Sequence, residues 1–248
     1  MSEAEIYYEV HGQGPGIVFA HGLGGNHMTW WQQVPFFSER YTCVTFAARG
    51  FYPSSGDADP ARNAEDLVAL IDHLGLTRVT LVAQSMGGWA CVSYTLNHPE
   101  KVRGLVMAST LGGLRSPELF LGRADRDAGL FGRGIHPAAG ERMAREQPAL
   151  HLLYRLIDRL SLGLDKAALI PRLMAERDTE PAVLAGSPVP LLFIVGREDW
   201  GDAELEWLRA HFPGRRIEVI PDAGHSVYFE RPDKFNALVA EFQGTLPV

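Results

Sequence analysis

Residues 78–94 read RVTLVAQSMGGWACVSY: an apolar strand-like run, a sharp turn around Ser85, and the start of an apolar helix. A buried strand that turns at a serine and runs into a helix is the nucleophile-elbow arrangement. Strand and helix nearly touch at such a turn, so small neighbours are required, and Ala83 and Gly87 satisfy this. The stretch alone fits an ordinary buried serine before a Gly-rich helix equally well.

The composition predicts a soluble globular protein with a large core. Of 248 residues, 46% are hydrophobic, and no apolar run reaches the roughly 18 residues that a membrane span needs. The net charge is -7 and basic residues are not clustered, which argues against a nucleic-acid partner. Cys43 and Cys91 lie in apolar segments and are expected to be buried thiols. The N-terminus lacks the pattern of a secretory signal, so we expect a cytoplasmic location.

Short β-branched runs alternate with amphipathic stretches along most of the chain. Most of these runs are continuously apolar, as expected for strands covered on both faces. The alternation predicts an α/β fold with a mostly parallel, doubly wound sheet of about seven strands. The expected strands are Ile6–Val10, Ile17–Ala20, Tyr41–Ala47, Val79–Ala83, Val102–Ala108, Leu191–Val195 and Ile217–Ile220. The expected helices are Met28–Glu39, Pro60–Leu74, Met86–Asn97, Asp202–His211 and Pro232–Gln243.

One long segment breaks this alternation. No convincing strand is found between Thr110 and Ser187, and roughly 75 residues are too many for a connection. We therefore expect a core domain of residues 1–110 and 187–248, with a helical cap of residues 111–186 inserted in it. Such a lid over strand ends would roof a substrate pocket, although packing against the core explains each of its apolar residues taken singly. Its expected helical patches are Ala138–Glu146, Ala149–Leu160 and Lys166–Arg177.

A glycine-rich loop, HGLGG at residues 21–25, follows the second predicted strand. It lacks the glycine spacing of a dinucleotide loop and the Gly-Lys-Ser ending of a phosphate loop. Its better use is to bring backbone N–H groups close to an oxyanion, and we expect those of Leu23 and Met86 to do so. His21 is expected to hold this loop rather than to act as a base.

Two more loops follow strands later in the chain. GRED, residues 196–199, offers two carboxylates at the edge of the sheet that carries Ser85, while Asp202 is a plausible N-cap of the next helix. AGHS, residues 223–226, places His225 on a Gly-containing loop, from which it can reach across the sheet edge. A carboxylate there would orient and support the histidine, and the histidine would take the proton of Ser85.

With these loops the chain resembles the α/β-hydrolase fold superfamily over essentially its whole length. The matching stretches are HGLGG (21–25), AQSMGG (83–88), GRED (196–199), AGH (223–225) and ERP (230–232). The resemblance implies a triad of Ser85, Asp199 and His225, in the chain order of this scaffold. We expect neither a cofactor nor a metal. Asp199 is preferred to Glu198 because of its place in the family's Gly-x-x turn.

The chain departs from the family pattern after the strand expected at 41–47. Relatives commonly read Asp-x-Arg-Gly-x-Gly-x-Ser, whereas residues 47–54 read AARGFYPS, with Ala47, Tyr52 and Pro53 replacing usual residues. A repacked loop is the simpler explanation, and a reshaped pocket floor is the other. The candidates for the substrate pocket are Phe51, Tyr52, Trp89, Phe120, Phe131 and Tyr154.

The predicted function is a serine hydrolase that cleaves a small, largely apolar or aromatic carboxylic ester or lactone through an acyl-enzyme on Ser85. A coenzyme-A thioester stays open, since Arg115, Arg123, Arg126 and Arg133 could meet phosphates, although such arginines are more often a solvated face. Two further alternatives are a carbon-carbon bond hydrolase acting on a vinylogous diketone, and a non-hydrolytic cyclase or ligand receptor. The sequence leaves the choice between monomer and homodimer open.

Overall fold

Seven strands form one sheet in the order β1-β3-β2-β4-β5-β6-β7, in a computed structural model that describes residues 4–116, 129–130 and 132–247. Strands β2 to β7 are parallel, and β1 pairs with β3 in the antiparallel sense at one edge. All seven predicted strands are confirmed, with ends within two residues of those expected. They are β1 (Tyr8–His11), β2 (Gly16–Ala20), β3 (Thr42–Phe46), β4 (Val79–Gln84), β5 (Val102–Ala108), β6 (Leu191–Gly196) and β7 (Arg216–Ile220).

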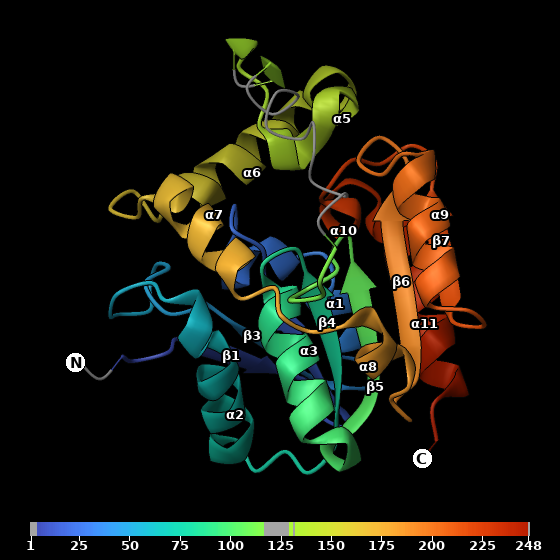
Figure 1. Ribbon diagram of the computed structural model, residues 1–248. Helices are drawn as coiled ribbons and strands as arrows, with labels where there is room; N and C mark the ends of the chain where they lie inside the picture. Colours follow the sequence, from blue (N-terminus) through green and yellow to red (C-terminus); the bar gives the residue numbers. More distant parts are fainter. Residues whose placement is uncertain (1–3, 117–128, 131, 248) are drawn as a thin grey trace.

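Helices cover both faces of this sheet (Figure 1). Alternate residues of β2 enter different cores: Val18 packs in a cluster with α2, α3 and α9, and Phe19 in a cluster with α1 and α11. Because both faces are buried, the central strands are mostly apolar. β2 has no polar side chain, whereas β4 carries Thr80 and Gln84. These helices are α1 (Val34–Phe37), α2 (Asn63–His73), α3 (Gly87–Asn97), α9 (Asp202–His211) and α11 (Pro232–Thr245).

The helix expected at Met28–Glu39 is wrong as a single element. The structure has a short helix η1 (His27–Trp30), a turn, and then α1. Pro35 accounts for the break, because its ring lacks an N–H and would clash with the carbonyl of Trp31 in a continuous helix. The other core helices are confirmed to within about three residues. Shorter elements are η2 (Pro60–Arg62), η3 (Pro99–Lys101) and the unforeseen α10 (Val227–Glu230).

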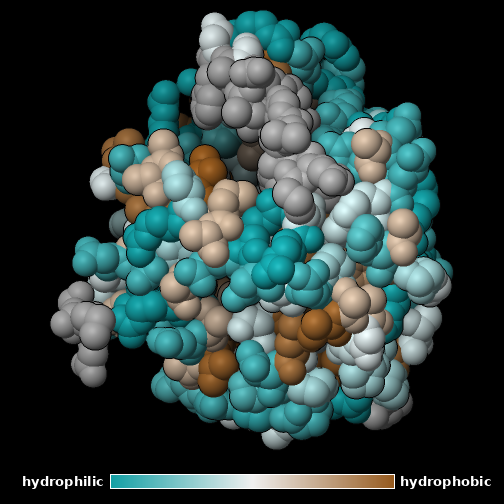
Figure 2. All heavy atoms as spheres, in the orientation of Figure 1, coloured by the Kyte–Doolittle hydropathy of each residue, from teal (hydrophilic) through white to brown (hydrophobic). Residues whose placement is uncertain are grey.

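A helical insertion follows β5 and precedes β6. It contains η5 (Pro137–Ala139), α5 (Gly140–Glu146), α6 (Pro148–Arg159), α7 (Lys166–Ala175) and α8 (Pro181–Ala185). Figure 1 shows α5, α6 and α7 grouped beyond the carboxyl ends of the strands, while α8 lies beside the sheet and contacts α9. In the same orientation, Figure 2 shows a hollow between this insertion and the rest of the molecule. The insertion therefore stands over the sheet edge where the predicted site loops emerge.

Candidate active site

Ser85 lies in a strained turn between β4 and α3. Its φ of 48° falls in the left-handed region, which costs energy for a residue with a side chain and persists only where the surroundings enforce it. Two hydrogen bonds to its carbonyl enforce it: Thr110 Oγ1 donates at 2.8 Å and the Gly88 N–H at 2.9 Å. A Cβ on Gly87 would lie 2.4 Å from the Ala20 carbonyl oxygen, so only glycine lets helix and strand approach this closely.

Asp199 and His225 are brought together at the same edge. Asp199 follows β6, His225 follows β7, and His225 Nδ1–H donates to Asp199 Oδ2 at 2.8 Å. The Asp199 side chain is 1% exposed, so this hydrogen bond is shielded from water on the side of the acid. Because Nδ1 is engaged by the carboxylate, Nε2 is left as the nitrogen that can accept a proton from a nucleophile.

The serine turn lies against the histidine loop through its neighbour. Gln84 Nε2 donates to the backbone oxygen of His225 at 3.3 Å, which fixes the end of β4 beside that loop. No hydrogen bond joins the side chains of Ser85 and His225 in residues 4–116 and 132–247. Catalytic hydrogen bonds are often long in unliganded enzymes and tighten when substrate binds.

The glycine-rich loop after β2 lies next to Ser85. A Cβ on Gly22 would stand 2.9 Å from Ser85 Cβ and 2.0 Å from Gln84 Oε1, so the loop backbone meets the serine turn directly. Among the described residues, no group accepts a hydrogen bond from the backbone N–H of Leu23 or of Met86. Two unsatisfied donors flanking a strained serine form a geometry suited to stabilising an oxyanion.

His21 holds the glycine-rich loop in place. Its Nε2 accepts the Ala48 N–H at 2.9 Å, so Nδ1 carries the proton and donates to the Gly22 carbonyl at 2.8 Å. Burial lowers the pKa of His21 to about 4, which keeps the ring neutral at ordinary pH. Both ring nitrogens form hydrogen bonds within the fold, as expected for a histidine that holds this loop.

The two other acidic residues that follow β6, Glu198 and Asp202, each pair with an arginine. Glu198 pairs with Arg142 of α5 at 3.7 Å, away from His225. Asp202 is 81% exposed, pairs with Arg197 at 2.7 Å, and is the first residue of α9 rather than its N-cap, which is Gly201. The expectation that Asp202 caps the helix is therefore wrong, because Gly201 already has the extended backbone that the capping position needs.

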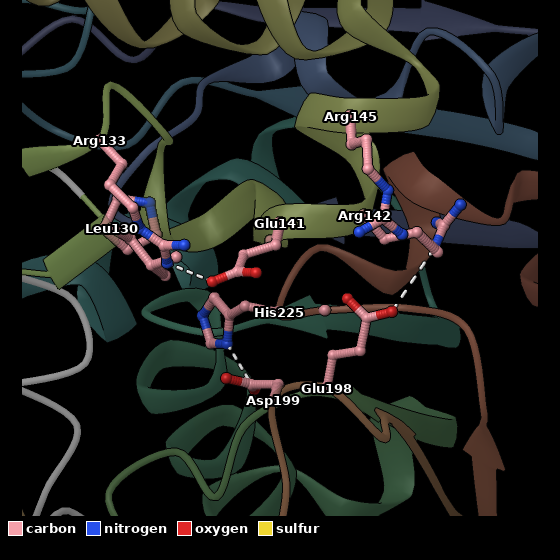
Figure 3. Close-up of a pocket in the computed structure, with 11 residues that line it drawn as sticks. Leu130, Arg133, Glu141, Arg142, Arg145, Glu198, Asp199 and His225 are labelled. Carbon is pink, nitrogen blue, oxygen red and sulfur yellow. Dashed lines mark hydrogen bonds and ion pairs between the residues drawn. The ribbon is translucent and has the colours of Figure 1, made fainter.

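A cavity of about 410 Å³ opens between α5 and the loops of Asp199 and His225. Figure 3 shows His225 between Asp199 below and Glu141 of α5 above, with Arg142 above Glu198. Its charged side chains are paired: Arg133 with Glu141, Arg145 with Glu146, and Arg142 with three carboxylates. His225 and Asp199 therefore line a cavity between the insertion and the core.

The predicted pocket residues fall in several places. Phe51 is buried, with its ring centroid 5.0 Å from that of His21. Tyr52 is 54% exposed and lines a second cavity, of about 420 Å³, with residues 160–165. Trp89 Nε1 donates to the Leu173 carbonyl of α7 at 2.9 Å. Tyr154 is buried and its hydroxyl accepts a hydrogen bond from Ser226 Oγ at 3.1 Å. Phe120 and Phe131 lie outside the described residues.

The loop that departs from the family pattern is held by other contacts. Ser54 Oγ donates to the Ala47 carbonyl at 2.6 Å, and the Tyr52 N–H donates to Ser161 Oγ of the insertion at 3.1 Å. Arg49 forms a buried ion pair with Asp66 of α2. The loop without its usual aspartate is thus tied both to the core and to the insertion.

Two charged residues of the site were not assigned a role from the sequence. Arg142 and Glu230 form a buried pair between α5 and α10, and Glu230 accepts the N–H of Gly224, the residue before His225. Glu230 entered only as part of the ERP match, and no pattern marks Arg142, because the two residues lie 88 positions apart. In the sequence Arg142 stands beside the apolar Met143, but α5 is too short for its sequence pattern to predict which side of the helix faces the core.

The part of the chain that the structure describes contains no group of three or more potential metal ligands, and no helix there has the length and apolarity to cross a membrane. Cys43 and Cys91 are buried free thiols, as expected, and burial raises the pKa of Cys43 to about 12. Neither thiol is available as a nucleophile at neutral pH.

Comparison with known proteins agrees with the geometry. The model of the alpha/beta hydrolase family matches residues 17–238. A 3-oxoadipate enol-lactonase of Acinetobacter baylyi is 27% identical over 96% of this chain and 92% of its own length. A putative non-heme bromoperoxidase of Mycobacterium tuberculosis is 30% identical over 96% of this chain and 97% of its own. The solved structure of Est816, described as an N-acyl homoserine lactone degrading enzyme, is 28% identical with a TM-score of 0.76, covering 96% of this chain and 97% of that one.

Proposed function

The chain belongs to the alpha/beta hydrolase family, and we propose that it cleaves a small, largely apolar or aromatic carboxylic ester or lactone through an acyl-enzyme on Ser85. One observation carries the proposal: a nearly buried Asp199 holds His225 through Nδ1, on the loops that flank a strained serine turn. In this arrangement the serine is activated by a histidine whose orientation a carboxylate fixes.

The proposed reaction has two halves. His225 Nε2 takes the Ser85 proton as Ser85 Oγ attacks the carbonyl carbon, and the same proton then passes to the leaving alkoxide oxygen. In the second half His225 takes a proton from water, the resulting hydroxide attacks the acyl carbon, and the acid leaves as the Ser85 hydroxyl is restored. Asp199 stabilises the imidazolium that forms in each half.

The free N–H groups of Leu23 and Met86 are the proposed donors to the oxyanion. A single donor of this kind contributes about 3 kcal/mol to the transition state, so both are needed for useful turnover. Their side chains belong to an apolar cluster that includes Leu169 and Leu173 of α7. This apolar surface beside the oxyanion donors supports an apolar acyl group, with residues 111–186 acting as a cap over it.

The relatives support the choice of substrate class. One is named as an enol-lactonase and a solved relative as a lactone-degrading enzyme. A lactone is a cyclic ester, so the same attack by Ser85 opens its ring and the leaving alkoxide stays attached to the acyl chain. An ester or lactone therefore needs no residue beyond those already placed at the site.

The test compares wild type with Ser85→Ala on p-nitrophenyl esters of graded chain length, a panel of lactones, and a vinylogous diketone. We expect the wild type to hydrolyse short esters or lactones and to be labelled by a fluorophosphonate, and Ser85→Ala to lose both properties. Labelling and turnover that survive in Ser85→Ala would refute the role of this serine. Turnover of the diketone alone would replace ester cleavage by carbon-carbon bond hydrolysis.

A further inference from the structure

Arg142 of α5 is a buried cation that reaches from the insertion to both triad loops. Its side chain is 8% exposed. Nη2 donates to Glu230 Oε2 at 3.4 Å, Nε lies 3.7 Å from Glu198 Oε1, and Nη1 lies 3.5 Å from Glu146 Oε2 on its own helix. Glu198 directly precedes Asp199, so one guanidinium contacts the acid loop on one side and α10 on the other.

Glu230 passes this contact on to the histidine loop. It is 0% exposed, and its Oε1 accepts the Gly224 N–H at 3.0 Å, on the peptide immediately before His225. The acid loop is joined to the same segment, because the Glu198 N–H donates to the Ala223 carbonyl at 3.0 Å. Arg142 is therefore linked to both loops. It pairs with Glu198, which precedes Asp199, and it contacts Glu230, which holds Gly224 next to His225.

The backbones of α5 and the histidine loop also meet directly. A Cβ on Gly224 would stand 3.3 Å from Gly140 Cα and 2.9 Å from Glu230 Oε1. Gly140, the first residue of α5, has a φ of 70°, which glycine adopts without strain. The backbone at the start of this helix packs directly against the loop of His225, so a movement of the helix would displace the loop.

Such a buried cluster of charged and hydrogen-bonded groups fixes geometry more than it adds stability. Taking charges out of water offsets most of their mutual attraction, and apolar replacements of buried ion pairs are often neutral or stabilising. Removing one partner alone is different, because it leaves a buried charge without compensation. An arginine held among carboxylates behind a catalytic histidine is thus better explained by positioning than by stabilisation.

We propose that Arg142 is a positioning residue for the hydrolysis proposed above: by holding Glu198 and Glu230 it fixes the loops of Asp199 and His225 and makes turnover depend on the docking of α5. The inference rests on the proposed function. It assigns Arg142 no contact with substrate, so its loss lowers kcat while leaving KM nearly unchanged.

The charge of Arg142 also acts on the pH dependence. The groups facing the cluster are Glu141, Arg145 and Glu146 of α5, Arg133 before it, Glu198 and Asp199 of the acid loop, His225, and Glu230 of α10. Burial raises the pKa of Glu230 to about 8, so its carboxyl is mostly neutral near pH 7. The other carboxylates still outnumber the arginines once the guanidinium is removed, and they favour the protonated triad. The acid limb of the pH profile of kcat/KM therefore moves to higher pH in Arg142→Met.

The experiment compares Arg142→Met and Arg142→Lys with Arg159→Met and Arg159→Lys, in the full chain with p-nitrophenyl acetate. Arg159 is a matched control, since it ends α6 of the same insertion, is exposed, and lines neither of the two cavities described above. We expect Arg142→Met to lower kcat about 100-fold, the scale of a 1 Å misplacement of catalytic groups. Arg142→Lys keeps the charge and the acid limb, but loses about tenfold because an ammonium lacks the guanidinium fork. Both controls are expected within about twofold of wild type.

Each outcome separates this proposal from the function on which it rests. A wild-type chain that neither turns over esters nor reacts with a fluorophosphonate removes the proposed function itself. An active wild type in which the Arg142 variants match the Arg159 variants in kcat and acid limb overturns the positioning role. If circular dichroism shows that Arg142→Met does not fold, the comparison of Arg142→Lys with Arg159→Lys decides by the same criteria.

Discussion

Gly22→Ala tests how closely the glycine-rich loop, the proposed source of an oxyanion donor, must approach the serine turn. The added Cβ would lie 2.9 Å from Ser85 Cβ and 2.0 Å from Gln84 Oε1, where ordinary carbon contacts begin near 3.5 Å. Gln84 cannot swing away freely, because it is 1% exposed and its Nε2 is bonded to the His225 backbone. The loop must therefore move by about 1 Å relative to Ser85, a misplacement that typically costs about 100-fold in rate.

The assay is kcat/KM on p-nitrophenyl acetate, beside the rate of fluorophosphonate labelling and the thermal unfolding midpoint. Both reactivities are expected to fall about 100-fold, which corresponds to about 2.7 kcal/mol of transition-state stabilisation. Gly244→Ala is the control, since Gly244 lies in α11 and a Cβ there meets nothing within 4 Å. A Gly22→Ala protein that keeps kcat/KM within threefold of wild type would refute the assignment of this loop to the oxyanion.

Three further substitutions test groups buried around the site. The unfolded chain protonates His21 below about pH 6.5 but the folded one only near its pKa of about 4, so the contribution of His21 to stability falls on acidification; in urea unfolding the difference between wild type and His21→Gln should fall by about 2 kcal/mol from pH 7 to 5. Burial raises the pKa of Glu230 to about 8, so the folded state keeps a proton that the unfolded state releases above about pH 4.5; its contribution declines by about 3 kcal/mol between pH 5 and 8, and a Glu230→Gln curve that parallels wild type would contradict this. Tyr154→Phe leaves the buried Ser226 hydroxyl without its acceptor and should cost about 1 kcal/mol in denaturant unfolding; an unchanged midpoint would mean that this bond adds nothing.

The sheet could be predicted from the sequence because strands buried on both faces have a strong local signature. Runs such as Leu191–Gly196 are apolar at every position, and their ends are set by glycine or polar residues that follow. The break between η1 and α1 was missed because Met28–Glu39 has apolar residues at helical spacing, and Pro35 decides against the pattern. The four residues of α10 escaped because one helical turn carries no period that can be detected.

In the site, too, some positions could be predicted from the sequence and others could not. Ser85, Asp199 and His225 each follow a strand directly, and parallel strands bring their carboxyl ends to one edge, so sequence order was enough to place them together. The pocket residues depend instead on how the insertion packs, which sequence periodicity does not contain. Tyr154 was expected to line the pocket, and the structure shows that its hydroxyl accepts a hydrogen bond from Ser226, the residue after His225.

The contacts that hold the histidine loop come from elements that the strand pattern does not specify. Gln33, in the turn before α1, donates to the Tyr228 carbonyl at 3.0 Å, and Tyr154 of α6 accepts from Ser226. Arg142 adds the contact to Glu230 from α5. Strand order therefore brings Ser85, Asp199 and His225 to one edge, while side chains distant in sequence fix the loop that carries His225. Because two of these three contacts come from the insertion, substitutions in α5 and α6 should alter kcat even where they touch no substrate.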